Sequence, residues 1–274
     1  MGSDALNKPI TYQKEAGVAT LTFNRAEARN ALTPEMLCRL ADAIVDFAND
    51  DNLRVAIITG TGDKAFCSGG DLARTLPLLT GHRPPTDEWD RRLLGDPVVS
   101  AASSLRGYPL NKPVISAING TCLAAGMELM LATDIRVAAI HASFGLPEVT
   151  RALIPFAGSM ARLPRQIPYC QAMELMLVGD AINADEALRR GLVNYVVPAD
   201  QVMEKAHLLA RKIAANGPLA VQSVKQTVMA TSGLELQQSF LIEDQAKRVV
   251  LSSEDAREGP RAFTERRLPR FIGR

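Results

Sequence analysis

Residues 114–129 read VISAINGTCLAAGMEL, and this stretch joins two patterns of different period. Its first five residues form a short continuous apolar run, which is typical of a strand buried in a parallel sheet. Small residues follow, and the segment 123–132 is apolar and rich in helix formers. The stretch therefore predicts a buried strand that leads through a tight turn into a buried helix.

The same alternation of strand and helix continues on both sides. Runs at residues 18–23, 55–59 and 135–139 predict further strands. Thr33 is suited to cap a helix that begins at Pro34. The apolar residues of that helix share one face: Met36, Leu37, Leu40, Ile44 and Phe47. Strands that alternate with helices in this way predict an α/β core with crossover connections.

The last third of the chain has a different character. After about residue 158 one clear strand remains, at 193–197, and helices are predicted at 172–177, 184–190, 200–215, 218–230, 234–251 and 254–267. Ser253 is suited to cap the last of these. We divide the chain into an α/β core at 1–200 and a helical region at 201–274. The proline-rich segment 74–108 is the least regular stretch, and long irregular loops are usually functional or mobile.

Composition excludes several classes of protein. The 274 residues carry 31 Lys+Arg against 30 Asp+Glu, for a net charge of +1, and 47% of them are hydrophobic. A balance so close to zero argues against nucleic acid or a membrane surface as partner. No apolar run approaches the roughly 20 residues of a membrane span, and the first residues lack the pattern of a signal peptide. Six arginines against two glutamates nevertheless give residues 257–274 a local charge of +4.

Cysteine and histidine do not form a recognisable site. The four cysteines, at 38, 67, 122 and 170, are scattered, which favours reduced thiols in the cytoplasm over zinc or disulfides. The three histidines lie far apart, so we expect no metal site. Chemistry in this chain is expected to rest on carboxylates and backbone groups.

Three segments are candidates for that chemistry. In AFCSGGDL (65–72) adjacent glycines follow a strand and allow a ligand close to the backbone, although a plain tight turn explains them too. In 119–129 the unpaired N–H groups that begin a helix could stabilise an oxyanion, and Ala125 and Glu128 share one helical face. Glu128 facing solvent is the alternative. In FGLPE (144–148), Glu148 belongs either to a site or to an ordinary turn.

Together with NR (24–25), RNAL (29–32), ATDIRVAA (132–139), IPFAGSMARLPR (154–165) and EGPRAFTERR (258–267), these segments resemble the crotonase (enoyl-CoA hydratase/isomerase) superfamily. The resemblance covers most of the chain, and RLPRQIP (162–168) and the C-terminus look most like the carnitinyl-CoA dehydratase branch. It implies a crotonase-like α/β fold of repeated ββα units with a helical trimerisation region. A homotrimer or homohexamer is expected.

The resemblance also implies a reaction. An acyl-CoA thioester is the expected substrate, with coenzyme A part of that substrate and no separate cofactor or metal. By motif position the N–H groups of Gly70 and Ala125 would hold the thioester oxygen, with Ala125 replacing a common glycine. Glu128 and Glu148 match the paired glutamates of hydratases. We assign water activation to Glu128 and α-proton transfer to Glu148, with the reverse or a shared role open.

Further residues are implied to bind the substrate. Coenzyme A is expected against the backbone of the glycine loop and against side chains of the C-terminus: Ala65, Ser68, Gly70, Asp71, Leu72, Ala73, Arg29, Phe263 and Arg266. The last two are expected to act from a neighbouring subunit, and Phe263 packing on its own helix is the alternative. Phe156 departs from the glycine common in the family and is expected to narrow the acyl pocket.

The predicted function is reversible hydration of an enoyl-CoA. A double-bond isomerase is the alternative within the family, because many members keep one glutamate. The alternative that is not an enzyme is a non-catalytic member of the family that binds acyl-CoA. The retained pair of glutamates argues against it.

Overall fold

Two sheets lie at the centre of the fold in the computed structural model, which describes residues 8–274. The larger has six strands in the order β1 (Ile10–Glu15), β2 (Val18–Phe23), β3 (Val55–Gly60), β5 (Val114–Ile118), β7 (Ile135–Ala139) and β10 (Tyr195–Val197). Its pairings are parallel except for β1 with β2. The smaller sheet has the order β4 (Ala65–Cys67), β6 (Thr121–Leu123), β8 (Ser143–Gly145) and β9 (Ile182–Asn183).

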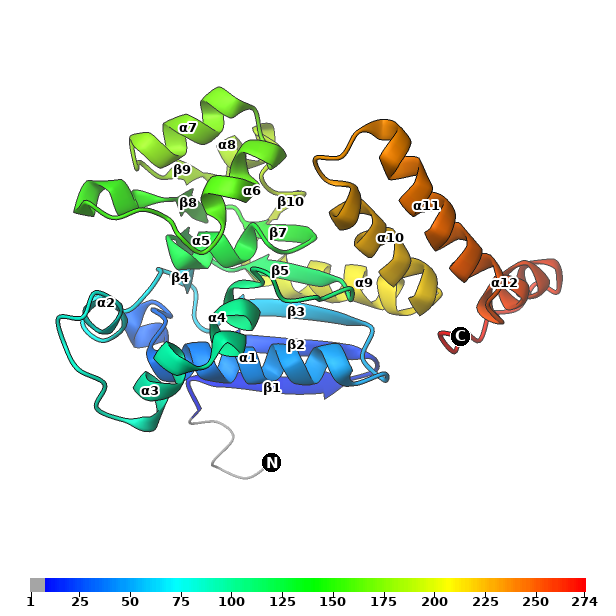
Figure 1. Cartoon of the computed structure of the whole chain (residues 1–274), viewed down its shortest axis with the longest axis horizontal. Helices are drawn as coiled ribbons and strands as arrows, with labels where there is room; N and C mark the ends of the chain where they lie inside the picture. The colour runs from blue at the N-terminus through cyan, green and yellow to red at the C-terminus, as the bar shows by residue number, and fades with distance from the viewer. Residues whose placement is uncertain (1–7) are drawn as a thin grey trace.

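The chain repeats one unit to build both sheets. The strands β3, β5 and β7 of the larger sheet are each followed by a strand of the smaller sheet and then by a helical segment. Figure 1 shows the two sheets and the helices that cover them. The predicted α/β fold of repeated ββα units is confirmed.

Burial explains why these segments form the centre of the sheet. Every residue of β5, and all of β3 except its last glycine, is buried, as the continuous apolar runs predict. Helix α1 (Pro34–Asn49) begins where predicted, and the Thr33 hydroxyl accepts the Met36 N–H at 3.2 Å. Of its predicted apolar face, four residues are buried and Leu37 is half-buried.

The helix predicted at 123–132 is shorter than expected. Helix α5 spans Ala125–Met130, and the preceding residues form β6. Strand β6 forms because it pairs with β4 on one side and β8 on the other, so tertiary pairing overrides local helix propensity. The turn between β6 and α5 thus lies at an end of the smaller sheet.

The segment 74–108 is more ordered than predicted. It contains three helices, α2 (Thr75–Leu79), α3 (Glu88–Gly95) and α4 (Pro97–Ser104). Asp87 caps α3 by accepting the Asp90 N–H, and Asp96 caps α4, in which Pro97 occupies the first turn. The expectation of an irregular loop was wrong because two of the helices carry local caps and start signals.

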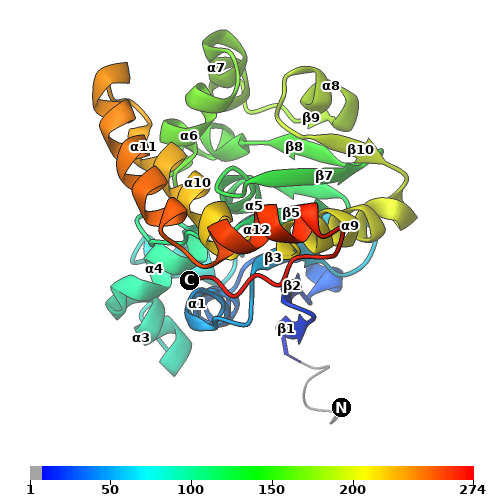
Figure 2. The same ribbon diagram turned by 90° about the vertical axis from the view of Figure 1, so that its right-hand side faces the viewer.

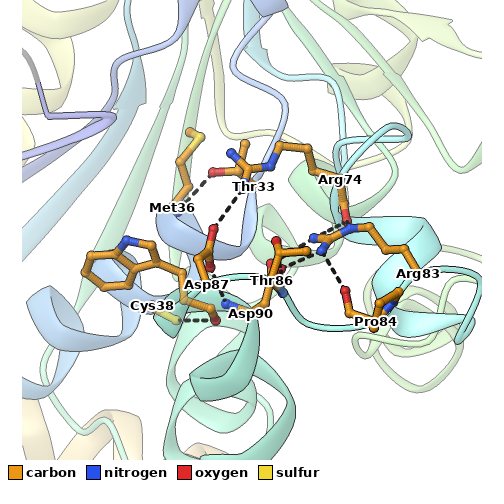
Figure 3. A network of polar contacts seen from close by, with 10 residues as sticks. Thr33, Met36, Cys38, Arg74, Arg83, Pro84, Thr86, Asp87 and Asp90 are labelled. Atoms are coloured by element: carbon orange, nitrogen blue, oxygen red, sulfur yellow. Dashed lines mark hydrogen bonds and ion pairs between the residues drawn. The ribbon is translucent and has the colours of Figure 1, made fainter.

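A buried ion pair closes the loop between α2 and α3 (Figure 3). The carboxylate of Asp90 is fully buried and accepts two hydrogen bonds from the Arg83 guanidinium, at 2.5 and 2.7 Å. The Thr86 N–H and hydroxyl donate to the same carboxylate, and Arg83 also donates to the carbonyl of Arg74. These bonds fix α2 and α3 relative to each other.

Helices dominate the remainder of the chain. They are α6 (Ser159–Gln166), α7 (Tyr169–Leu177), α8 (Ala184–Arg189), α9 (Val202–Ala214), α10 (Pro218–Thr231), α11 (Leu236–Leu251) and α12 (Asp255–Thr264). Helix α9 packs against β3, β5 and β7. Helices α10 and α11 pair with each other and bury no residue within the described chain. In Figures 1 and 2 they extend away from the sheets.

The C-terminal residues fold back on α12. The Asp255 carboxylate accepts the N–H groups of Ile272 and Gly273, both at 2.8 Å. Ser253 lies one residue before Glu254, the N-cap of α12, and its hydroxyl accepts the N–H of Ala256 in the first turn of that helix. Glu258 pairs with Arg261 and Arg267, so part of the predicted basic end is neutralised locally.

Among residues 8–274, no helix is long and apolar enough to cross a membrane. The same residues contain no cluster of three His, Cys, Asp or Glu side chains that could hold a metal ion.

Candidate active site

Two backbone N–H groups meet where β4 and β6 end. Gly69 has φ +108°, and a Cβ there would lie 2.7 Å from the Cβ of Ala124 and 3.6 Å from the amide nitrogen of Ala125. The chain therefore passes from Gly69 to Gly70 directly beside the start of α5. Within the described residues neither the Gly70 nor the Ala125 N–H donates a hydrogen bond. Both are free to bind an oxygen of a ligand.

Close packing holds the start of α5 in this position. A Cβ at Gly126 would lie 2.5 Å from the carbonyl oxygen of Cys67, so only glycine fits there. Ala124 has φ +48°, which is strained for a residue with a side chain. Its N–H donates to the carbonyl of Gly145 at 3.0 Å. Strain of this kind is typical of functional sites.

Glu128 lies one helical turn after Ala125 and is buried, with 3% of its surface exposed. The alternative that it faces solvent is therefore wrong. Its Oε1 accepts the N–H groups of Ala157 at 2.6 Å and of Ser159 at 3.3 Å. Burial raises the pKa of the Glu128 carboxyl, and these N–H groups oppose the rise because they stabilise the charged form.

The carboxyl group of Glu148 differs from that of Glu128 in its hydrogen bonds. It lies in the 3-10 helix η3 (Pro147–Arg151), and its buried Oε2 has no hydrogen-bond partner among the described residues. Burial, and to a lesser extent the charge of Glu128, raises the pKa of Glu148 to about 7, although the backbone N–H of Glu148 itself and the charge of Arg151 oppose the rise. A buried carboxyl oxygen without a partner is rare in folded proteins. It points to a group that a ligand supplies.

The two carboxylates and the two N–H groups line one cavity of about 320 Å³. Its apolar wall comes largely from helices α1, α2, α3 and α5, with Leu37, Leu76, Leu93 and Leu129 among the lining residues. The cavity thus combines an apolar chamber with acid–base groups and free N–H donors. Such a combination is typical of an enzyme site for a molecule with a hydrocarbon part.

Several predicted binding residues line this cavity: Ser68, Gly70, Leu72, Ala125 and Phe156. Asp71 is buried and does not line the cavity. Burial opposes ionisation of Asp71, but an ion pair with Arg25 at 2.5 Å and the N–H groups of Ala73 and Arg74 outweigh it, so its pKa is lowered. Within this chain, the Asp71 side chain therefore anchors the loop that carries Gly70.

The other predicted residues lie outside the cavity lining. Arg29 is exposed, and its carbonyl accepts the Ser68 N–H at 3.1 Å, which places its backbone beside the glycine loop. Ala65 is buried, and its carbonyl accepts the side-chain amide of Asn30. Phe263 lies in α12 and is 87% exposed, and Arg266 follows that helix. Helix α12 lies at the opposite end of the fold from α2 (Figure 1).

Several residues of the cavity are not among those predicted from the sequence. They are Arg106 and Arg151, and on α4 the hydroxyl-bearing residues Ser100, Ser103 and Ser104. These serines are spaced at i, i+3 and i+4 in a helix that Asp96 caps and Pro97 begins. This spacing indicates that they share one helical face. The prolines and charges of residues 74–108 hide this signal, because they favour a loop over a helix.

Comparison with known proteins identifies the family of the chain. The model of the enoyl-CoA hydratase/isomerase family matches residues 13–274. The chain belongs to this family.

Two relatives match along nearly their whole length. The enoyl-CoA hydratase EchA19 of Mycobacterium tuberculosis is 40% identical over 100% of this chain and 98% of its own. The carnitinyl-CoA dehydratase of Proteus mirabilis is 38% identical over 98% of this chain and 100% of its own. The crystal structure of an enoyl-CoA hydratase from Bacillus anthracis superposes with a TM-score of 0.87 at 37% identity, covering 97% of this chain and 100% of that chain. Family membership confirms the resemblance and the crotonase fold.

Proposed function

We propose that this chain catalyses the reversible hydration of a 2-enoyl-CoA to a 3-hydroxyacyl-CoA. The observation that carries the proposal is the pair of carboxyl groups on the cavity: Glu128 accepts two N–H groups on one oxygen, whereas Glu148 has a buried oxygen with no partner among the described residues. Hydration needs a base for water and an acid for the α-carbon, and two carboxyls in unlike environments can divide this work. An isomerase needs only one base, so the pair favours hydration.

The N–H groups of Gly70 and Ala125 would receive the thioester oxygen. Charge moves onto that oxygen when water adds at C3, and both donors face it without a competing bond. One such donor is typically worth about 3–4 kcal/mol in the transition state. Because these contacts come from the backbone, Ala125 serves as well as glycine.

Glu128 is the proposed base, because the N–H groups of Ala157 and Ser159 stabilise its ionised form. It takes a proton from water as the oxygen attacks C3, and the electron pair of the double bond moves toward the thioester oxygen. Glu148, with its raised pKa, is the proposed acid and delivers its proton to C2. One hydroxyl and one hydrogen are thus added across the double bond, and the reverse sequence expels water.

The coenzyme A part would lie along the glycine loop. We propose that the backbone of residues 65–73, with Arg29 beside it, receives this part of the substrate. We propose that Phe263 and Arg266 contribute from a neighbouring copy, because α12 lies at the opposite end of the fold from α2, whose Thr75 and Leu76 line the cavity (Figure 1).

We further propose that copies of the chain associate through α10 and α11 into a trimer or a pair of trimers. These helices leave large apolar side chains uncovered: Val224, Val228, Met229, Leu236, Leu241 and Val249. Contiguous apolar surface of this kind usually marks an interface. Sedimentation should give three or six times the chain's mass of 29.6 kDa, and a monomer would contradict this.

The reaction is tested by loss of the enoyl-thioester absorbance with a panel of enoyl-CoAs. The proposal expects hydration by the wild-type protein. Binding without turnover of any member would instead favour a non-catalytic acyl-CoA-binding role.

A further inference from the structure

One wall of the cavity carries free hydrogen-bond donors that the proposed reaction does not use. Ser100 and Ser103 of α4 line the cavity, and neither hydroxyl has a partner among the described residues. Leu105, with φ +50°, ends α4, and Arg106 follows it on the cavity lining. Ser100, Ser103 and Arg106 together form a polar wall of the cavity, the α4 wall.

Arg106 is exposed, and its guanidinium is anchored at one nitrogen. Its Nη1 donates to the carbonyl of Phe156 at 2.8 Å. Its Nε and Nη2 make no hydrogen bond within residues 8–274. A guanidinium anchored on one nitrogen with the others free presents a preformed fork for a carboxylate.

The charges around the cavity favour an anion. The charged lining residues are Arg106, Arg151, Glu128 and Glu148. Glu148, with a pKa raised to about 7, carries only part of a negative charge at neutral pH. Arg162 adds a third cation behind the lining, where its Nη2 donates to the carbonyl of Leu105 at 2.6 Å. The arginines therefore outweigh the glutamates.

We propose that the acyl group of the substrate carries a carboxylate of its own, which the Arg106 fork binds with the α4 wall hydroxyls. The inference rests on the proposed function, because it names the substrate class of the same site. The leucines receive the hydrocarbon part, and the wall receives the charged end. A quaternary ammonium acyl group is disfavoured here, although several relatives are carnitinyl-CoA dehydratases.

Three enoyl-CoAs of matched length and different charge test this. They are 4-carboxybut-2-enoyl-CoA (anionic), pent-2-enoyl-CoA (neutral) and 4-trimethylammoniobut-2-enoyl-CoA (cationic). We expect kcat/KM for the anion to exceed that for the neutral thioester about tenfold or more, on the scale of one hydrogen bond to a charged group. The cation should be slowest. Equal or better hydration of the neutral thioester overturns the inference and leaves the proposed function intact.

Single-residue variants test whether Arg106 causes the preference for the anionic thioester. Arg106→Ala should reduce the anionic-to-neutral ratio to about one, whatever it does to the absolute rates. Arg91→Ala is the matched control, since Arg91 is exposed in α3 and lies off the cavity lining, and it should keep the wild-type ratio. An equal loss for all three thioesters in Arg106→Ala overturns the inference, because it assigns Arg106 to coenzyme A or to folding.

A binding measurement tests recognition of the carboxylate independently of the proposed hydration reaction. Calorimetry with the saturated thioesters 4-carboxybutanoyl-CoA and pentanoyl-CoA needs no turnover. Tighter binding of the anionic thioester, lost in Arg106→Ala, supports the inference even if no enoyl-CoA is hydrated. Equal affinity for the two overturns it.

Discussion

The Oε1 of Glu128 lies 2.6 Å from the amide nitrogen of Ala157 and accepts its hydrogen bond. This contact joins α5, which begins with a proposed oxyanion donor, to the loop before α6. It stabilises the Glu128 carboxylate, whereas the buried oxygen of Glu148 has no such donor among the described residues. The unequal roles of the two glutamates follow from this difference.

Replacing Glu128 with Gln should lower kcat about 100-fold or more, the usual scale of general base catalysis, with a smaller effect on KM. The amide oxygen can still accept from Ala157, so the fold should survive. Steady-state kinetics with an enoyl-CoA measure the effect. Glu204→Gln, on the exposed surface of α9, is the control and should match wild type. Wild-type kcat in Glu128→Gln would rule out the assigned base.

The pH profile of hydration should report Glu148. Its acid form delivers the proton, so activity falls as pH rises through the raised pKa of about 7. Arg151 lowers this pKa, so Arg151→Gln should move the falling limb to higher pH. A profile of kcat/KM from pH 5 to 9 measures both. An unmoved limb in the variant contradicts the assignment.

Gly126→Ala should damage both stability and activity. The added Cβ would lie 2.5 Å from the Cys67 carbonyl and force α5 away from β4, at a cost of about 1–3 kcal/mol. The matched control is Gly95→Ala in α3, where nothing lies within 4 Å of the new Cβ, and it should be neutral or slightly stabilising. Thermal unfolding distinguishes the two, and equal melting temperatures would refute the close packing.

Asp90→Asn should weaken the connection between α2 and α3 (Figure 3). Arg83 lowers the pKa of Asp90 well below its usual range. The ion pair therefore stabilises the fold above the ordinary carboxyl pKa, and this contribution is lost as pH falls through the lowered one. At pH 7 the variant should lose about 1–3 kcal/mol, the cost of a disrupted buried polar group.

Denaturant unfolding at several pH values checks this. The difference in free energy of unfolding between wild type and Asp90→Asn should become smaller toward strongly acidic pH. If this difference in free energy of unfolding does not depend on pH, the charge of Asp90 does not stabilise the fold.

Continuous apolar runs and local caps made much of the fold predictable. The strands at 18–23, 55–59, 114–118 and 135–139 and the cap at Thr33 lie where the sequence places them. The short strands β4, β6 and β8 were not predicted, because each of these three-residue strands is defined by its partners in the smaller sheet.

The site was predictable to a similar extent. Glu128, Glu148, Gly70 and Ala125 could be named from motifs, and all four line one cavity. Arg106 could not, because nothing local to its sequence shows that it meets the carbonyl of Phe156, which is 50 residues away. Such contacts depend on how distant loops pack, and the sequence carries no periodic signal for them.

The central claim, hydration by two carboxyl groups, is tested most directly by the product formed in D₂O. The protein is incubated with pent-2-enoyl-CoA, and the product is analysed by NMR. The account predicts 3-hydroxypentanoyl-CoA with one deuterium at C2, together with loss of this product in both Glu128→Gln and Glu148→Gln. A shifted double bond without a hydroxyl group, or full activity in both variants, would contradict it.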